Sequence, residues 1–179
     1  MMKQAVAIGT AIALSAAPVA EPAEAAELFG GIYAHDVDTA LTRGGFEGGV
    51  DLQLGVRGNR LEGLRAIGAP SPHLFVSANS RGDTNFASAG ISWKVGETLY
   101  LRPGVGLAVH DRSSRVVRGG IRADFGSRLL FAPEVGIGYQ LNDRISVEAS
   151  WVHLSHAQLL SRQNPGMDDF GLRLNYRFR

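Results

Sequence analysis

Residues 145–155 read Ile-Ser-Val-Glu-Ala-Ser-Trp-Val-His-Leu-Ser, and this stretch decides the fold. Its alternate positions are apolar up to Trp151, which is the period of a β-strand with one apolar face. His153 and Ser155 continue the same positions, so they belong to that face. Farther along the chain, Asp168 shares its parity with the apolar residues that end at Phe178. If the two segments pair as a hairpin, an acid, a base and a hydroxyl meet on one apolar surface.

The rest of the chain repeats this alternation. Eight segments fit a strand: 27–36, 50–56, 73–79, 87–95, 99–109, 129–139, 145–155 and 168–178. No segment has a sustained helical period, so the sequence predicts an all-β protein. Residues 59–72 are the least regular, and they fit either a short helix or an irregular extension of the third strand.

Regular alternation is compatible with two classes of β-protein. A soluble barrel or sandwich turns its apolar face inward, whereas a membrane barrel turns that face toward lipid. Here the polar face carries glycine and small residues beside charged ones, which suits the narrow lumen of an eight-stranded barrel. We expect Arg102, Glu134 and Arg173 to form an ion-pair network in that lumen.

Loop lengths favour the membrane barrel. The connections at 96–98 and 141–143 are tight, whereas those at 37–45, 111–126 and 157–167 are long. Short periplasmic turns and longer external loops are typical of outer-membrane proteins. The sequence therefore predicts an eight-stranded antiparallel transmembrane β-barrel in the bacterial outer membrane, with its termini in the periplasm. Trp93 and Trp151 are expected to anchor its interfacial aromatic girdles.

The N-terminal residues 1–25 have the features of a secretory signal peptide. Lys3 precedes an apolar run, and Ala23-Glu-Ala25 offers the small residues that signal peptidase accepts. Cleavage after Ala25 would leave residues 26–179 as one barrel domain. Without Lys3, Glu21 and Glu24, that domain holds 17 basic and 15 acidic residues, a balance that does not suggest nucleic acid as a partner.

The sequence implies no metal and no organic cofactor. Cysteine is absent, the five histidines lack the HExxH spacing of zinc proteases, and no glycine-rich loop follows a strand and opens a helix. His73 and His110 are expected to be packing or interface residues rather than metal ligands.

His153, Ser155 and Asp168 are the candidate site. Residues directly opposite on paired strands have Cβ atoms about 4.5–5.5 Å apart, and diagonal ones about 7–8 Å apart. An imidazole can therefore bridge the hydroxyl and the carboxylate whether Ser155 or His153 lies opposite Asp168. Such an arrangement of nucleophile, base and orienting acid is the one that acyl transfer needs. Asp169 is the competing acid, but its parity points into the barrel.

A turn at Asn164-Pro-Gly166 lies between the two strands. Its amide side chain and backbone N–H groups could stabilise an oxyanion. The alternative interpretation is that His and Ser are tolerated at a membrane interface, where polar residues cost only about 0–1 kcal/mol.

Three motifs, His153-Leu-Ser155, Asn164-Pro-Gly166-Met-Asp168 and the closing Tyr176-Arg-Phe178, resemble the lipid A 3-O-deacylase family of Gram-negative outer membranes. The segments 66–73 and 82–84 are also similar to that family. The resemblance implies a barrel that removes the ester-linked acyl chain at the 3-position of lipid A. It further implies a serine nucleophile at Ser155, a histidine base at His153, an acid at Asp168 and an oxyanion donor at Asn164. The chain departs from the family at two positions. The family acid is commonly Glu, whereas Asp168 stands here, and Asn often follows the nucleophile, whereas His156 stands here. By parity His156 faces inward, and we interpret it as structural.

Two other functions remain open on the sequence alone: a non-catalytic structural or adhesion barrel, and an esterase of the same mechanism that acts on phospholipids. The expected partners of the deacylase are lipopolysaccharide and the surrounding outer-membrane lipids. The sequence leaves the oligomeric state open, a homodimer included. Arg162 in the last long loop is a candidate contact for lipid A phosphates, although a solvated loop charge is the simpler interpretation.

Overall fold

The computed structural model of the protein describes residues 26–42, 45–111 and 123–178, so the predicted signal peptide lies outside the described residues. The described part holds no helix that is long and apolar enough to cross a membrane. Its one helix, η1 (Glu62–Ile67), is a 3₁₀ helix. It lies in the segment 59–72, for which the sequence allowed either a short helix or an irregular extension of the third strand.

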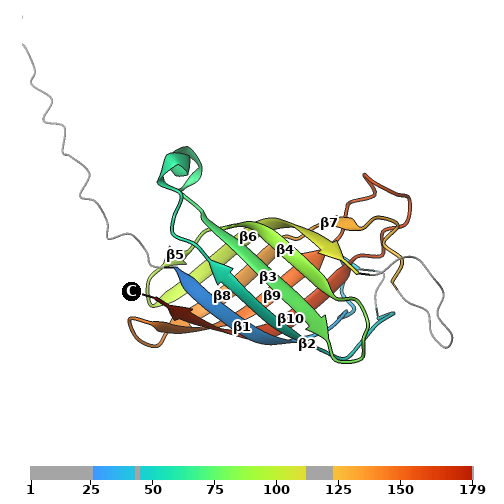
Figure 1. Cartoon of the computed structure of the whole chain (residues 1–179), viewed down its shortest axis with the longest axis horizontal. Coiled ribbons are helices and arrows are strands. Elements are labelled where there is room, and N and C mark those ends of the chain that lie inside the picture. The colour runs from blue at the N-terminus through green and yellow to red at the C-terminus, as the bar shows by residue number, and fades with distance from the viewer. Residues whose placement is uncertain (1–25, 43–44, 112–122, 179) are drawn as a thin grey trace, which may run out of the picture.

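Strands make up the body of the molecule (Figure 1). Their bounds are β1 (Glu27–Ala34), β2 (Val50–Arg57), β3 (Ser71–Asn79), β4 (Phe86–Ser92), β5 (Val95–Gly96), β6 (Leu99–His110), β7 (Leu129–Phe131), β8 (Glu134–Gln140), β9 (Ile145–Leu154) and β10 (Met167–Arg177). All pairings are antiparallel, and the order β4-β3-β2-β1-β10-β9-β8-β6 closes through the pairing of β4 with β6. The first strand ends at Ala34 and not at Asp36 as predicted, because Asp36 takes a left-handed conformation with φ of 50°.

The ten segments form eight barrel strands. β4 and β5 pair with β6 in one continuous register, and so do β7 and β8. Each interruption lies beside a proline, Pro103 opposite the first gap and Pro133 within the second, and proline has no N–H to give to the ladder. The predicted eight-stranded antiparallel barrel is confirmed.

The two faces of the barrel have opposite polarity. In β2, Asp51 and Gln53 are buried in the lumen, whereas Leu52 is 64% exposed on the outside. Leu99 and Leu172 are likewise 68% and 72% exposed on the outer face. An apolar outer face around a polar interior is the pattern of a barrel in lipid, not of a soluble one.

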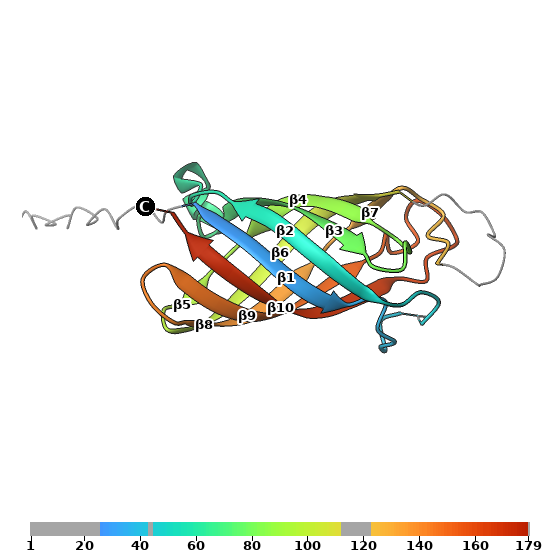
Figure 2. The ribbon, with the colours of Figure 1, turned by 60° about the horizontal axis from the view of Figure 1, so that its bottom comes forward.

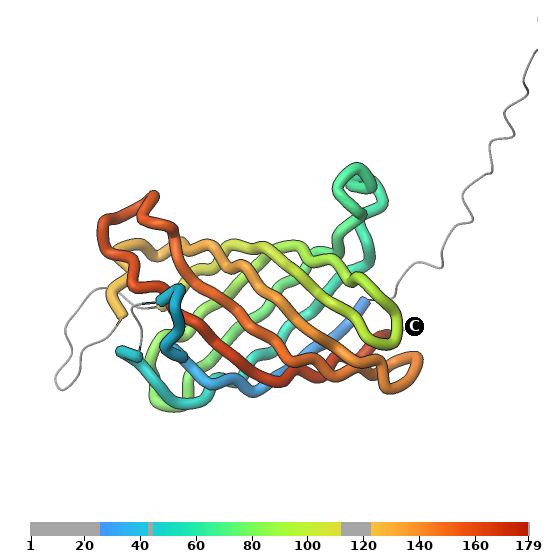
Figure 3. The backbone as a smooth tube through the Cα atoms, turned by 180° about the vertical axis from the view of Figure 1, so that it is seen from behind, coloured from blue at the N-terminus to red at the C-terminus, as the bar shows by residue number. Residues whose placement is uncertain are grey.

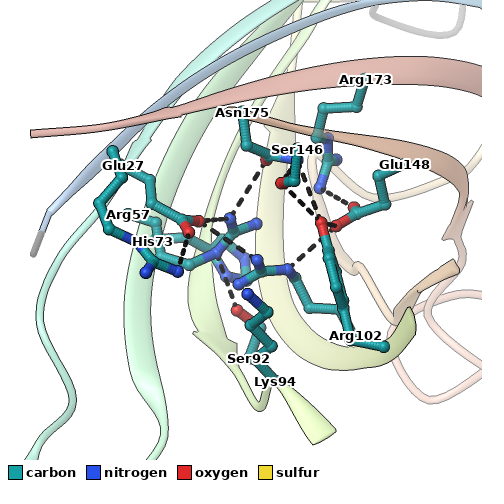
Figure 4. Close-up of polar contacts among 12 residues, drawn as sticks. Glu27, Arg57, His73, Ser92, Lys94, Arg102, Ser146, Glu148, Arg173 and Asn175 are labelled. Carbon is teal, nitrogen blue, oxygen red and sulfur yellow. Dashed lines mark hydrogen bonds and ion pairs between the residues drawn. The ribbon is translucent and has the colours of Figure 1, made fainter. Parts of the chain in front are cut away.

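Ion pairs fill the lumen (Figure 4). The guanidinium of Arg173 contacts Glu134 at 3.1 Å and Glu148 at 3.2 Å. Arg102 contacts Glu148 at 3.0 Å and Glu27 at 3.3 Å. The predicted lumen network therefore exists, and it extends beyond the three residues named from the sequence. Because buried charges are tolerated only when they are paired, this network helps to explain how a polar core is stable.

The barrel has two unlike ends, which the views in Figures 2 and 3 place at opposite poles. The turn end carries the C-terminus, η1 and the short connections after β5 and β8. The loop end carries the connections 35–49, 80–85, 111–128 and 155–166. The long connections predicted from the sequence all lie at the loop end, although residues 43–44 and 112–122 fall outside the described part.

Candidate active site

β9 and β10 bring the candidate site together at the loop end. Their register places His153 directly opposite Asp168, which is one of the two registers that the sequence allowed. The side chains share the outer face of the barrel, in line with the lipid-facing residues below them. The positions of the three residues thus follow from strand parity and from a single hairpin.

The three side chains form a continuous hydrogen-bonded chain. Nδ1 of His153 lies 2.7 Å from Oδ1 of Asp168, and Nε2 lies 2.9 Å from Oγ of Ser155. An ionised carboxylate can only accept, so the ring proton is on Nδ1 and Nε2 is left to accept from the serine hydroxyl. This is the tautomer in which an imidazole can act as a base toward Ser155.

Asp168 is completely buried, although it belongs to the outer face of the strand. The indole N–H of Trp151 donates to Oδ1 at 2.9 Å, and the hydroxyl of Thr39 donates to Oδ2. The backbone N–H of Val37 also donates to the Asp168 carbonyl at 2.8 Å. Donors from β9 and from the loop after β1 therefore cover and orient the acid.

Ser155 follows β9 and is held by a short backbone bridge to β7. Its N–H donates to the Phe131 carbonyl at 3.1 Å, and its carbonyl accepts from the Phe131 N–H at 2.6 Å. The N–H of His153 donates to the carbonyl of Pro133 at 3.0 Å. These contacts fix the backbone on both sides of the hydrogen bond between the base and the hydroxyl.

The turn that contains Asn164 and Gly166 packs beside this chain. The N–H of His156 donates to Oδ1 of Asn164 at 3.1 Å, which leaves the amide group Nδ2 of Asn164 as the available donor. Gly166 has a φ of 73°, and a Cβ there would lie 3.2 Å from Cε1 of His153. The backbone conformation therefore favours glycine at this position, and a side chain there would crowd the imidazole.

His156 and Asp169 are not part of the hydrogen-bonded set Ser155–His153–Asp168. Nε2 of His156 contacts the carbonyls of Phe125 and Gln163, at 2.6 and 2.9 Å, and the side chain is fully buried between two loops. Asp169 points into the lumen, where its Oδ1 accepts from the N–H of Asp36 at 3.2 Å. Of the two candidate acids, Asp168 is therefore the one in contact with His153.

The lumen side of this region holds His35, between Asp51 at 3.0 Å and Glu47 at 3.1 Å. Burial disfavours the charged imidazole, but the hydrogen bonds to Asp51 and Glu47 and the nearby charge of Asp169 outweigh it and raise the pKa of His35 to about 10. For Glu47, burial is outweighed by its hydrogen bonds to His35 and Thr84, which lower its pKa to about 2.

A groove of about 500 Å³ runs along the outer face next to the site. It lies across β8, β9 and β10 and is lined by Val135, Ile137, Ala149, Ser150, Trp151, Phe170 and Gly171. The small side chain of Ala149 leaves space between the larger residues of the neighbouring strands. The volume is within the range of small-molecule sites, and the lining is almost entirely apolar.

Sequence reasoning missed two contacts of the site. Trp151 was expected only as an interfacial anchor, yet its indole N–H is bound to Asp168. No pattern in the sequence links Thr39 to Asp168, because the two residues are 129 positions apart in the chain. Strand order supplies the missing signal for Thr39: β1 pairs with β10, so the loop that follows β1 begins beside the start of β10.

A protein-family model matches most of the chain. The model of the family described as Lipid A 3-O-deacylase (PagL) matches residues 36–177, a range that contains every residue of the candidate site. No curated protein matches the chain.

Several solved structures are similar to this chain in fold. The crystal structure of the outer membrane enzyme PagL is 16% identical, with a TM-score of 0.60, covering 85% of this chain and 99% of that one. Neisserial surface protein A is 12% identical, with a TM-score of 0.57 and coverage of 88% and 100%. The N-terminal β-barrel domain of Pseudomonas aeruginosa OprF is 10% identical, with a TM-score of 0.54 and coverage of 87% and 100%. At these identities the likeness shows the fold alone.

Proposed function

Since the chain belongs to the lipid A 3-O-deacylase (PagL) family of the outer membrane, we propose that it hydrolyses the 3-O-acyl ester of lipid A by a Ser-His-Asp mechanism. Ser155 is the nucleophile, His153 the base and Asp168 the orienting acid. The observation that carries this proposal is the hydrogen-bonded chain Ser155–His153–Asp168 on the lipid-facing surface. A purely structural or adhesive barrel would have no use for such a chain.

The geometry supports a two-step acyl transfer. Oγ of Ser155 attacks the ester carbonyl carbon while Nε2 of His153 takes the hydroxyl proton. The tetrahedral intermediate collapses, the bond to the sugar oxygen breaks, and His153 returns the proton to that oxygen. Water then attacks the acyl-serine, gives a proton to His153 and releases the fatty acid, and the proton returns to Ser155. Asp168 stabilises the imidazolium that forms in both steps.

The oxyanion of each tetrahedral intermediate needs a donor near Ser155. Nδ2 of Asn164 is our candidate, because the N–H of His156 holds the other end of the same amide. Gly166 supports the turn at a point where a larger residue would press on the imidazole.

The position of the groove supports a lipid substrate. It is apolar, open to the outer face and lined in part by Trp151, whose indole also contacts Asp168. A fatty acyl chain that enters sideways from the bilayer can lie in this groove while its ester reaches Ser155. The substrate then never crosses the lumen, which ion pairs fill.

Replacing the nucleophile and the base tests the mechanism. Ser155→Ala and His153→Ala should each abolish the loss of one hydroxy-fatty acid from lipid A, measured by mass spectrometry of lipid A from expressing cells. Ser161→Ala removes a hydroxyl from the same long loop and should retain activity. Heat-modifiable migration on gels checks that each barrel is folded. Full activity in either of the first two variants would refute the assignment.

The same mechanism could act on phospholipids, and a direct comparison separates the two substrates. Purified protein in detergent should release fatty acid from lipid A and not from phosphatidylethanolamine. Equal rates on the two lipids would replace the lipid A assignment with a general esterase.

A further inference from the structure

A second polar cluster lies at the loop end of the lumen, on the other side of β10 from Ser155. This His35 cluster consists of His35, Asp36, Glu47, Asp51 and Asp169, and none of its members is more than 8% exposed. The proposed deacylation does not use any of them.

Three potential ligand atoms of the cluster, one each from His35, Asp51 and Asp169, lie at distances from one another that would allow them to bind the same ion. Nδ1 of His35 lies 3.0 Å from Oδ2 of Asp51 and 3.6 Å from Oδ1 of Asp169. One ligand atom from each of these residues lies within 4.8 Å of the other two. Nitrogen and oxygen ligands at zinc-like bond lengths in a tetrahedral arrangement are about 3.4 Å apart, so the observed distances bracket that value.

The surroundings of the three residues are those of a metal site's outer shell. The other imidazole nitrogen, Nε2 of His35, faces Oε2 of Glu47 at 3.1 Å. A carboxylate on the far nitrogen is the usual way in which a ligating histidine is oriented. Ser77 and Asn79 donate to the two oxygens of Asp51, at 2.9 and 2.8 Å, and hold that carboxylate in place.

The cluster contains more carboxyl groups than cationic partners in the described part of the chain. It contains four carboxylates, and the ion pairs that these carboxylates make within the described residues all run to His35. Oδ2 of Asp169, Oε1 of Glu47 and Oδ1 of Asp36 are buried without a hydrogen-bond partner in the described part of the chain. Unpaired buried carboxylate oxygens are costly, and a bound cation would compensate for that cost.

We propose that Nδ1 of His35 and the carboxylates of Asp51 and Asp169 bind one divalent transition-metal ion of the Zn²⁺ class. One imidazole and two carboxylates suit such an ion better than Ca²⁺ or Mg²⁺, which prefer oxygen ligands alone. The ion takes the place of the proton that Nδ1 carries in the metal-free protein. No sequence spacing could indicate this site, because its ligands come from a loop and two strands far apart in the chain.

The role of the ion is structural. It joins the start of the loop after β1 to β2 and β10. Asp169 is adjacent to Asp168, and the same loop delivers the hydroxyl of Thr39 to Asp168. The ion therefore stabilises the loop that covers the triad acid, without contacting the reacting atoms.

Metal retention in the folded barrel tests the proposal. Untagged full-length protein, purified in detergent and stripped with a chelator, is loaded with Zn²⁺ and desalted, and its zinc is measured by mass spectrometry. The wild type should retain one equivalent and melt at a higher temperature with Zn²⁺ than without it. Asp51→Asn and Asp169→Asn should each weaken binding at least about tenfold. Asp83→Asn, which changes a carboxylate at the same end but outside the cluster, should bind as the wild type does.

Two results would overturn the proposal: a wild type that retains no zinc, or Asn variants that bind as tightly as the wild type. The first result would mean that a proton shared by Asp51 and Asp169 replaces the ion. If the variants do not fold, a Co²⁺ titration of the wild type decides. Visible absorption bands of a four-coordinate site, saturating at one equivalent, are then required, and their absence refutes the site.

Discussion

Replacing Asp168 with Asn should reduce deacylation far less than replacing it with Ala, because the neighbours of Asp168 can accommodate an amide. Trp151 and His153 both donate to Oδ1, at 2.9 and 2.7 Å, so the amide oxygen is held on that side. The amide NH₂ then faces Thr39, whose hydroxyl can change from donor to acceptor. His153 keeps its orientation and its tautomer, and only the negative charge beside it is lost.

The size of the loss follows from the change in one hydrogen bond. A hydrogen bond to a charged group contributes about 1.5–3 kcal/mol, and a neutral one about 0.5–1.5 kcal/mol. The difference of roughly 1–1.5 kcal/mol corresponds to about a tenfold lower kcat for Asp168→Asn. Asp168→Ala also frees the imidazole to take the wrong tautomer. That tautomer costs about 10⁴-fold in a serine protease triad, where the Asp→Asn variant itself produces it.

Thr39 provides the decisive comparison. Thr39→Val alone removes one hydrogen bond to Asp168 and should lower kcat by about tenfold at most. Combined with Asp168→Asn, it removes the acceptor that fixes the amide, so the double variant should lose more than the product of the two single effects. The assay is the initial rate of fatty-acid release from purified lipid A in detergent. The reasoning fails if Asp168→Asn is as inactive as Asp168→Ala, or if the two substitutions are simply additive.

Three further substitutions probe the turn, the groove and the lumen. Gly166→Ala strains a left-handed residue and presses on His153, so it should lower kcat about tenfold and stability by about 1 kcal/mol. The control Gly82→Ala, at a residue with φ of 70° and open space around it, should lower stability alone. Equal losses of activity in the two variants would contradict this prediction. Ala149→Leu fills the groove and should slow hydrolysis of long-chain esters, while a short-chain nitrophenyl ester is still cleaved. Equal losses of rate on both substrates would show that the groove does not bind the acyl chain. Arg173→Met removes the guanidinium that pairs with Glu134 and Glu148, and only Glu148 keeps a second arginine, Arg102. The loss should destabilise the barrel by about 3–5 kcal/mol in urea unfolding from lipid vesicles, and an unchanged midpoint would show that Arg173 adds nothing to stability.

Much of the fold could be predicted because side chains along a barrel strand alternate between the lipid and the lumen, so the sequence alternates between apolar and polar residues. Parity alone put His153, Ser155 and Asp168 on the outer face, and parity alone turned Asp169 inward. The register was not determined, because a shift by two residues preserves every face. Choosing between the two registers requires the packing of the whole hairpin.

Contacts between distant segments could not be predicted in the same way. Thr39 and Trp151 reach Asp168 because the strands close into a ring, and the direction of a loop side chain depends on backbone angles that no periodicity encodes. The breaks at Pro103 and Pro133 were also not foreseen, although the missing N–H of proline accounts for both.

The packed lumen sets the electrical character of the molecule. Interlocked guanidinium and carboxylate groups occupy the lumen, so insertion of this barrel should not raise the conductance of a bilayer. We therefore expect the barrel to leave the permeability of the outer membrane unchanged. The proposed catalysis takes place on the outer face of the barrel, separated from the charged lumen by the strands.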